Sequence, residues 1–269
     1  MKAAFLLALA LAGPAQALTS AEIDAAWNFD DPAASERRFR AERARWSDGS
    51  REALEIDTQV ARTLGLQKRY DEASALLDAV ARTLPNVSAR VDVRCFLERG
   101  RVYNSSGAAA QALPYFTGAA ERAAADREPD AAYYRIDALH MMGIAAPASA
   151  RTSWNRQALA AVDAATEPRA RGWRASILNN LGWSLLDDGD ATAALDAWQR
   201  ALVAREATGN VALTRIARWT VARGLRANGR LDEAERVQRE LAAELAREGK
   251  TDPDVQEELA EIAKAKAAR

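Results

Sequence analysis

The chain has 269 residues, of which 37 are lysine or arginine and 38 are aspartate or glutamate, so its net charge is close to zero. A neutral chain lacks the positive field that attracts nucleic acid or an anionic membrane, and we expect neither as a partner. The sequence is rich in alanine, leucine, arginine and glutamate. These residues favour helices, so the composition predicts an all-α protein.

The N-terminus has the pattern of an export signal. Lys2 precedes the apolar run AAFLLALALAG, which is too short to span a bilayer, and the small residues AQA end at Ala17. We expect residues 1–17 to be a signal peptide cleaved after Ala17, and the mature protein to be periplasmic without membrane insertion. No cysteine follows the run, so no lipid anchor is expected there. Cys95 is the only cysteine, which excludes an internal disulfide.

A turn followed by a helix with a key alanine recurs along the chain. The clearest copy is GDATAAL, with its alanine at Ala194, and similar segments contain Ala73, Ala112, Ala150 and Ala234. The alanines are about 40 residues apart, which indicates an array of helical hairpins. We place the hairpins near residues 54–87, 93–126, 131–164, 175–208 and 215–248.

The fourth unit resembles the tetratricopeptide repeat, whose pattern is W-x2-L-G-x2-Y, then A-x3-F, then P. Leu181, Gly182, Ala194 and Trp198 match this pattern. The second unit matches through Gly100, Tyr103, Ala112 and Phe116, and the first ends at Pro85. The resemblance implies a right-handed superhelical solenoid of about five hairpins. In such a unit the glycine lets the two helices approach closely, and the aromatic residue fills the remaining space.

We expect capping helices at both ends of the array. Residues 18–50 should form N-terminal caps, because Asp31-Pro32 is typical of a helix start. Residues 51–248 form the array, and residues 249–269 should form a C-terminal cap with acidic residues first and lysines last. The segment Ala164–Trp173 contains Pro168 and is expected to be a surface loop.

The resemblance also implies a binding groove, because positions 2, 5, 9 and 12 of each first helix face the concave side in this family. These positions lie on one helical stripe. They hold mainly arginine and tryptophan here, with a single acidic residue, Glu55. The candidate groove residues are Arg62, Arg94, Arg101, Asn104, Arg135, Asn179, Trp183, Trp219, Arg223 and Arg226. Leu139 and Met142 also fall on the stripe.

Two interpretations of these arginines stay open. Arginine binds carboxylates with two parallel hydrogen bonds, and tryptophan supplies buried area, so the stripe would suit an acidic peptide or protein segment. Alternatively, the arginines pair with carboxylates of the chain itself. Arg99 and Asp137 stand at equivalent, normally apolar positions of neighbouring units, which predicts that they pair with each other.

Little in the sequence points to catalysis. His140 is the only histidine, so a nucleophile–base pair or a histidine-rich metal site has almost no material, and we expect neither metal nor cofactor. His140 is expected near the groove rim, and Cys95 is expected to be buried. The sequence therefore favours a non-enzymatic module that binds a protein or peptide. The alternative is an assembly scaffold that acts through its convex face or by self-association.

Overall fold

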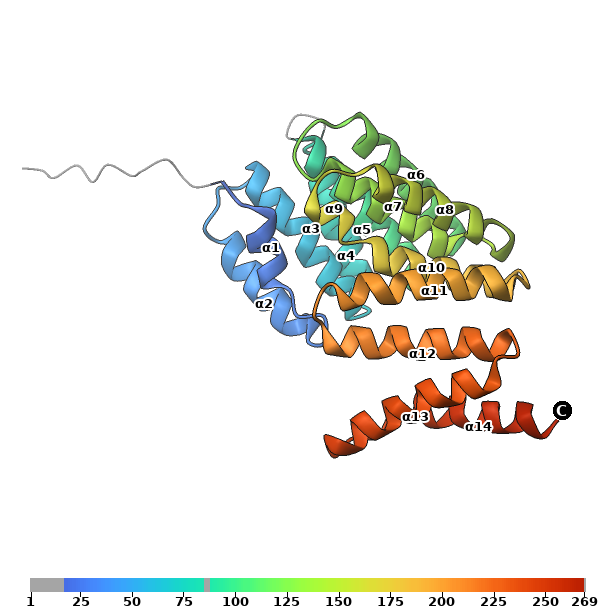
Figure 1. The fold of residues 1–269 in the computed structure, drawn as a ribbon. Helices are drawn as coiled ribbons and strands as arrows, with labels where there is room; N and C mark the ends of the chain where they lie inside the picture. The colour runs from blue at the N-terminus through green and yellow to red at the C-terminus, as the bar shows by residue number, and fades with distance from the viewer. Residues whose placement is uncertain (1–16, 85–87, 269) are drawn as a thin grey trace, which may run out of the picture.

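The computed structural model describes residues 17–84 and 88–268, and over these residues it contains fourteen α-helices and no strand. The all-α solenoid predicted from the sequence is confirmed (Figure 1). Most of the predicted signal peptide, and Pro85, lie outside the described residues. The helices are α1 (Ser20–Ala26), α2 (Pro32–Arg43), α3 (Arg51–Leu66), α4 (Tyr70–Ala81), α5 (Ala89–Ser105), α6 (Ala109–Ala125), α7 (Ala131–Ala145), α8 (Ala148–Ala164), α9 (Pro168–Arg171), α10 (Arg174–Asp187), α11 (Ala191–Glu206), α12 (Val211–Ala227), α13 (Leu231–Arg247) and α14 (Pro253–Ala267).

Five hairpins stack one after another: α3/α4, α5/α6, α7/α8, α10/α11 and α12/α13. Each packs against its neighbours in the chain, with α2 against α3 at one end and α14 against α13 at the other. The last hairpins lie in sequence order from α10 to α14 in Figure 1. The helices α2 and α14, which flank the array, each start at a proline that follows a capping aspartate: Asp31 accepts a hydrogen bond from Ala34 N, and Asp252 accepts one from Val255 N.

Glycine against an aromatic ring brings the two helices of a hairpin together. A Cβ atom on Gly100 would lie 2.5 Å from the Phe116 ring, and one on Gly182 would lie 2.4 Å from Trp198 Nε1. Both rings are fully buried. The ring of the second helix therefore fills the space that a side chain of the first helix would need, as the repeat pattern predicts.

The linker between α8 and α10 differs from the expected surface loop. Residues Pro168–Arg171 form the short helix α9, which packs against α7 and α8, and Ala170 within it is fully buried. Proline at the first turn is compatible with a helix because its missing N–H has no partner there anyway. The alanine then supplies an apolar contact that holds the linker on the array.

None of the described helices is long and apolar enough to cross a bilayer.

Cys95 is buried, as predicted, and its thiol donates to the carbonyl oxygen of Leu77 at 3.7 Å. Burial raises the pKa of this thiol to about 11.

Two glycine substitutions test the packing of the hairpins. Gly182→Ala should lower the free energy of unfolding by about 1–3 kcal/mol, because the new methyl group overlaps Trp198. Gly65→Ala should raise it by about 0.5–1 kcal/mol, because the same change meets only Val102 at an ordinary 3.7 Å and removes backbone freedom. Urea unfolding measures both, and equal effects would show that the ring does not limit the helix spacing.

Candidate functional site

One stripe of residues connects the first helices of the hairpins, and we call it the concave ladder: Arg62, Arg101, His140, Trp183 and Arg223. Each contacts the next helix of the stripe. Arg62 Nη1 lies 4.0 Å from Glu98 Oε1, Arg101 Nη2 lies 2.5 Å from Asp137, and the His140 ring lies 3.3 Å from the Asn180 amide. The Trp183 and Trp219 rings are 6.1 Å apart, and Arg223 lies 3.5 Å from Glu258 on α14.

The third unit is displaced by one residue from its predicted phase. Arg135 is exposed and away from the ladder, Leu139 and Met142 are buried in the core, and His140 occupies the ladder position. The turn between α7 and α8 has two residues, whereas the turn between α5 and α6 has three. If the residues of α7 are assigned by counting back from Ala150 with a three-residue turn, each falls one position too early in the sequence.

The predicted Arg99–Asp137 pair is wrong. Arg99 lies 2.7 Å from Asp78 on α4, and Asp137 is bound by Arg101. Residues 99 and 101 are two positions apart on α5, about 200° around the helix, so they face opposite neighbours. Burial acts to raise the pKa of Asp137, but the guanidinium groups of Arg101 and Arg62 outweigh it and lower that pKa below its ordinary value.

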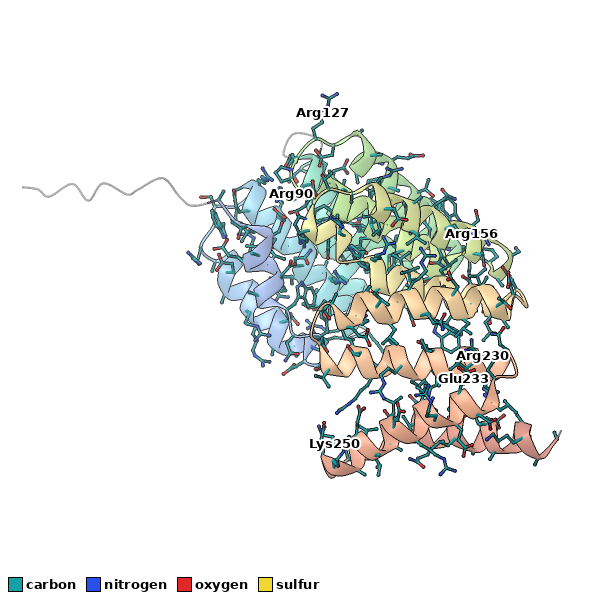
Figure 2. All side chains as sticks on the ribbon, in the orientation of Figure 1. Arg90, Arg127, Arg156, Arg230, Glu233 and Lys250 are labelled. Carbon is teal, nitrogen blue, oxygen red and sulfur yellow. The ribbon has the colours of Figure 1, made fainter. Side chains whose placement is uncertain are left out.

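Most of the candidate arginines lie next to carboxylates of the chain itself, as the second interpretation of the stripe expects. Glu55 lies 3.1 Å from Arg94, and Glu258 lies 2.5 Å from Arg226. The exposed charges Arg127 and Arg156 extend outward, whereas Arg90 lies among the helices (Figure 2).

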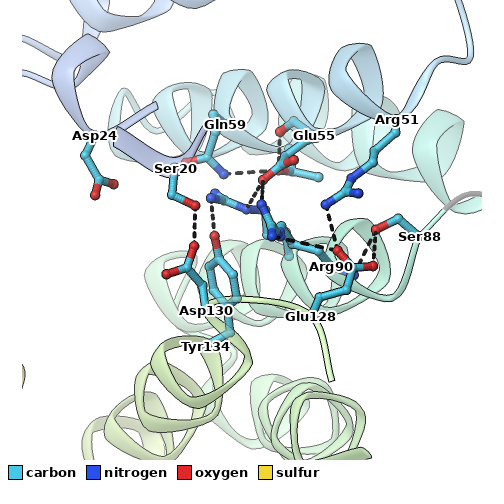
Figure 3. Close-up of polar contacts among 12 residues, drawn as sticks. Ser20, Asp24, Arg51, Glu55, Gln59, Ser88, Arg90, Glu128, Asp130 and Tyr134 are labelled. Atoms are coloured by element: carbon cyan, nitrogen blue, oxygen red, sulfur yellow. Dashed lines mark hydrogen bonds and ion pairs between the residues drawn. The ribbon is translucent and has the colours of Figure 1, made fainter. Parts of the chain in front are cut away.

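The pairs around α3, α5 and α7 form a charge network whose central carboxylates, Glu55, Glu98 and Asp137, are buried, and we call it the buried charge network. Figure 3 shows part of it, with Glu55 and Glu128 facing arginines and Ser20 donating to Asp130. Its arginines are Arg51, Arg62, Arg90, Arg94, Arg101 and Arg169. Its carboxylates are Asp24, Glu55, Glu98, Glu128, Asp130 and Asp137. The two sets balance, so the network is formally neutral.

A cavity of about 330 Å³ lies within this network. Side chains of α3, α5 and α7 line it, and α1 and α9 cover it, joined by the Asp24–Arg169 ion pair at 2.9 Å. Its lining residues include Trp27, Phe29, Arg62, Arg94, Glu98, Tyr133 and Trp173. Of the residues that line the cavity, the predicted groove contained Arg62 and Arg94. The cover depends on contacts between residues 145 positions apart, which a repeat pattern does not reveal.

A second, open part of the surface lies toward the C-terminus. The Arg223 guanidinium lies over both the Trp183 and Trp219 rings, 5.1 and 5.9 Å from their centroids. Trp219 also donates from Nε1 to the carbonyl oxygen of Asp254. Ile216, one turn before Trp219, is 57% exposed and borders a groove of about 370 Å³ with Leu241. We call Trp183, Ile216, Trp219 and Arg223 the tryptophan surface.

The remaining candidates, Asn179 and Asn104, make few side-chain contacts. Asn179 donates to Asn180 at 3.4 Å on α10, and Asn104 is half-buried near the end of α5. No group of three or more histidine, cysteine, aspartate or glutamate side chains in the described ranges could hold a metal ion.

The comparisons with known proteins agree with this architecture. Residues 174–208, which cover α10 and α11, match the tetratricopeptide repeat (TPR) family model. This match covers one hairpin and supports the resemblance to the TPR family. BtubC (BKLC) from P. vanneervenii has 16% identity, with 84% of this chain and 94% of that chain covered and a TM-score of 0.65. The apo form of RapI has 8% identity, coverages of 91% and 71%, and a TM-score of 0.66.

TPR-like repeats of a putative kinesin light chain from Podosopora anserina have 18% identity, coverages of 76% and 99%, and a TM-score of 0.59. At these identities the likeness shows the fold alone. No curated protein matches the chain. The TPR-like fold generally mediates protein–protein interaction, and TPR proteins are generally non-enzymatic scaffolds or interaction modules.

Removing Arg101 tests the buried charge network. Arg101→Met should cost about 3–5 kcal/mol of unfolding free energy, because it leaves Glu98 and Asp137 buried without their main partner. The matched control Arg200→Met removes an exposed ion pair with Asp196 and should cost about 0–1 kcal/mol. Denaturant unfolding compares the two. A small loss for Arg101→Met would mean that the pair contributes little to the packing of α5 against α7.

The single histidine gives a test by pH. Burial lowers the pKa of His140 below its ordinary value, although Asp137 acts in the opposite direction. Below about pH 6.5, the ordinary histidine pKa, the unfolded chain therefore binds a proton that the folded chain does not. The stability that this histidine provides is present above that pH and is lost as the pH falls toward the folded pKa.

Accordingly, the wild type should lose more unfolding free energy than His140→Gln between about pH 7 and pH 5.5. The carboxylates are the same in both proteins, so their titration cancels in the comparison. Parallel pH dependences would contradict the lowered pKa.

Proposed function

We propose that this chain is a non-enzymatic protein-binding module of the bacterial envelope, which holds a segment of a partner protein along the first helices of its hairpins. The observation that carries the proposal is the tryptophan surface. There, two half-buried indole rings, a guanidinium and an exposed isoleucine lie together on α10 and α12. Partly exposed tryptophan and arginine are the residue types that most often dominate protein interfaces.

The pairing of the arginines changes what the partner segment should contain. A groove of free arginines would select acidic residues, but Arg94, Arg101 and Arg226 already bind buried carboxylates. We therefore propose that an apolar side chain of the partner anchors at Ile216 and Trp219. An acidic residue would add to the binding chiefly at Arg223, whose side chain is 34% exposed and lies 3.5 Å from its carboxylate partner Glu258.

Export to the periplasm belongs to the same proposal. It rests on the N-terminal sequence, with Lys2, the apolar run and the small residues ending at Ala17. The balanced charge of the chain is compatible with a protein partner and offers no general attraction for nucleic acid.

Two aspartate substitutions distinguish the two faces of the solenoid. Ile216→Asp places a charge on the tryptophan surface, and Val203→Asp places the same charge on α11, a second helix, at a residue that is 67% exposed. Captured proteins would be quantified by mass spectrometry after an affinity pull-down from periplasmic extract. We expect Ile216→Asp to reduce capture of the specific partner at least about tenfold and Val203→Asp to leave it unchanged.

Circular dichroism of each variant establishes that it is folded, and the mass of the recovered bait shows whether residues 1–17 have been removed. Loss of the partner with Val203→Asp alone would move the interface to the second helices and favour the scaffold alternative. Equal capture by all three proteins would refute the tryptophan surface as the binding site.

A further inference from the structure

Arg62 differs from the other arginines of the covered cavity. Its guanidinium lies 5.2 Å from the centroid of Trp27 and 5.4 Å from that of Phe29. It makes no hydrogen bond with a described residue. The nearest carboxylate oxygen, Glu98 Oε1, is 4.0 Å away and already accepts a hydrogen bond from Arg101 at 2.6 Å. Burial and the nearby charge of Arg101 lower the pKa of Arg62, as expected for a cation without a close counter-ion.

The carboxylate of Glu98, which can accept hydrogen bonds, lies beside Arg62. Glu98 is 2% exposed, and its Oε2 atom accepts no hydrogen bond from the described residues. The Trp173 indole N–H, also at the cavity wall, is buried and has no acceptor among them. Buried polar atoms without partners carry a desolvation cost that a bound ligand can relieve. The cavity therefore offers free donors at Arg62 and Trp173, and a free acceptor at Glu98.

The charges around the cavity restrict the chemical class of ligand further. The charged residues that line the cavity are three arginines and three carboxylates: Arg62, Arg94, Arg169, Asp24, Glu98 and Asp137. Because this lining is formally neutral, a ligand with a net charge would leave one charge in the cavity uncompensated. A zwitterion avoids this cost because its two charges meet opposite partners. We propose that the cavity binds a small zwitterion of the amino-acid class, with its carboxylate at Arg62 and its ammonium group at Glu98.

The walls and size of the cavity suit such a ligand. Tyr133 and Trp173, whose ring centroids are 5.6 Å apart, provide aromatic faces on which an ammonium group or an apolar side chain can rest. The volume of about 330 Å³ is at the lower end of the range for small-molecule sites. Because α1 and α9 cover it, the cavity suits a free amino acid or a dipeptide better than a long chain.

Isothermal titration calorimetry of the full mature chain tests this proposal with named probes. The twenty L-amino acids and a series of unblocked dipeptides are titrated singly, and the tightest ligand is then repeated in its N-acetyl and carboxamide forms. We expect saturable binding of at least one free ligand and at least about tenfold weaker binding of each blocked form, because each has lost one charge. Free amino acids and dipeptides separate the two sizes of ligand.

Variants locate the site. Arg62→Gln should weaken the binding at least about tenfold. It should remain folded because Arg62 makes no hydrogen bond and is 27% exposed. Trp173→Phe keeps the ring but removes the N–H, and should weaken binding more modestly. Ile216→Asp lies outside the cavity and should leave the amino-acid affinity unchanged, so failure here and failure of the partner proposal are distinguishable.

Three results would overturn the zwitterion site. They are the absence of binding by every free amino acid and dipeptide, equal binding of a blocked form, and an unchanged affinity in Arg62→Gln.

Discussion

The array depends on the packing of an aromatic ring against a glycine, which has no side chain. Phe116 on Gly100 and Trp198 on Gly182 bring two helices to a distance at which no side chain fits between them. Trp198 also lies 2.9 Å from the position of a Cβ atom on Gly224, in the next hairpin. One ring thus sets the spacing within its own hairpin and to the following one, and the orientation of the concave side follows from that spacing.

The two halves of the concave side carry different kinds of residue. In the N-terminal half the ladder residue Arg101 is bound by the buried carboxylates of Glu98 and Asp137, whereas Arg62 has no close counter-ion. Such pairs contribute more to fixing which helices meet than to net stability, because desolvation offsets most of their attraction. In the C-terminal half the ladder positions carry Trp183 and Arg223 with rings partly exposed. Apolar area that faces solvent is available to a partner, whereas a paired charge is not.

The sequence predicts what is local and periodic. Alternation of helix and turn, the capped prolines and the glycine–aromatic pairs all follow from short-range rules, and the structure contains them. A one-residue difference in turn length was enough to misplace Arg135, because a helix rotates by about 100° per residue. The partners of Arg101 and Arg94 depended on which carboxylates lie across an interface, a property of the assembled helices.

The cover of the cavity was the least predictable element. Trp27 and Phe29 precede the array, and Arg169 belongs to a linker that appeared to be a loop. Nothing in their spacing relates them to Arg62. They meet because the superhelix curves far enough to bring α9 back to α1. Such contacts are determined by the curvature of the whole array and are therefore not visible in any one repeat.

Those contacts between α1 and the third hairpin also affect how the molecule folds. In an open solenoid each repeat touches only its neighbours, so unfolding can begin at either end and proceed one repeat at a time. Here Ser20 reaches Asp130, and Asp24 reaches Arg169, across 110 and 145 residues of chain. Side-chain contacts thereby link α1 to the third hairpin, and we expect the first three hairpins to unfold more cooperatively than a linear array. The last two hairpins, with α14, remain an open end where fraying costs least.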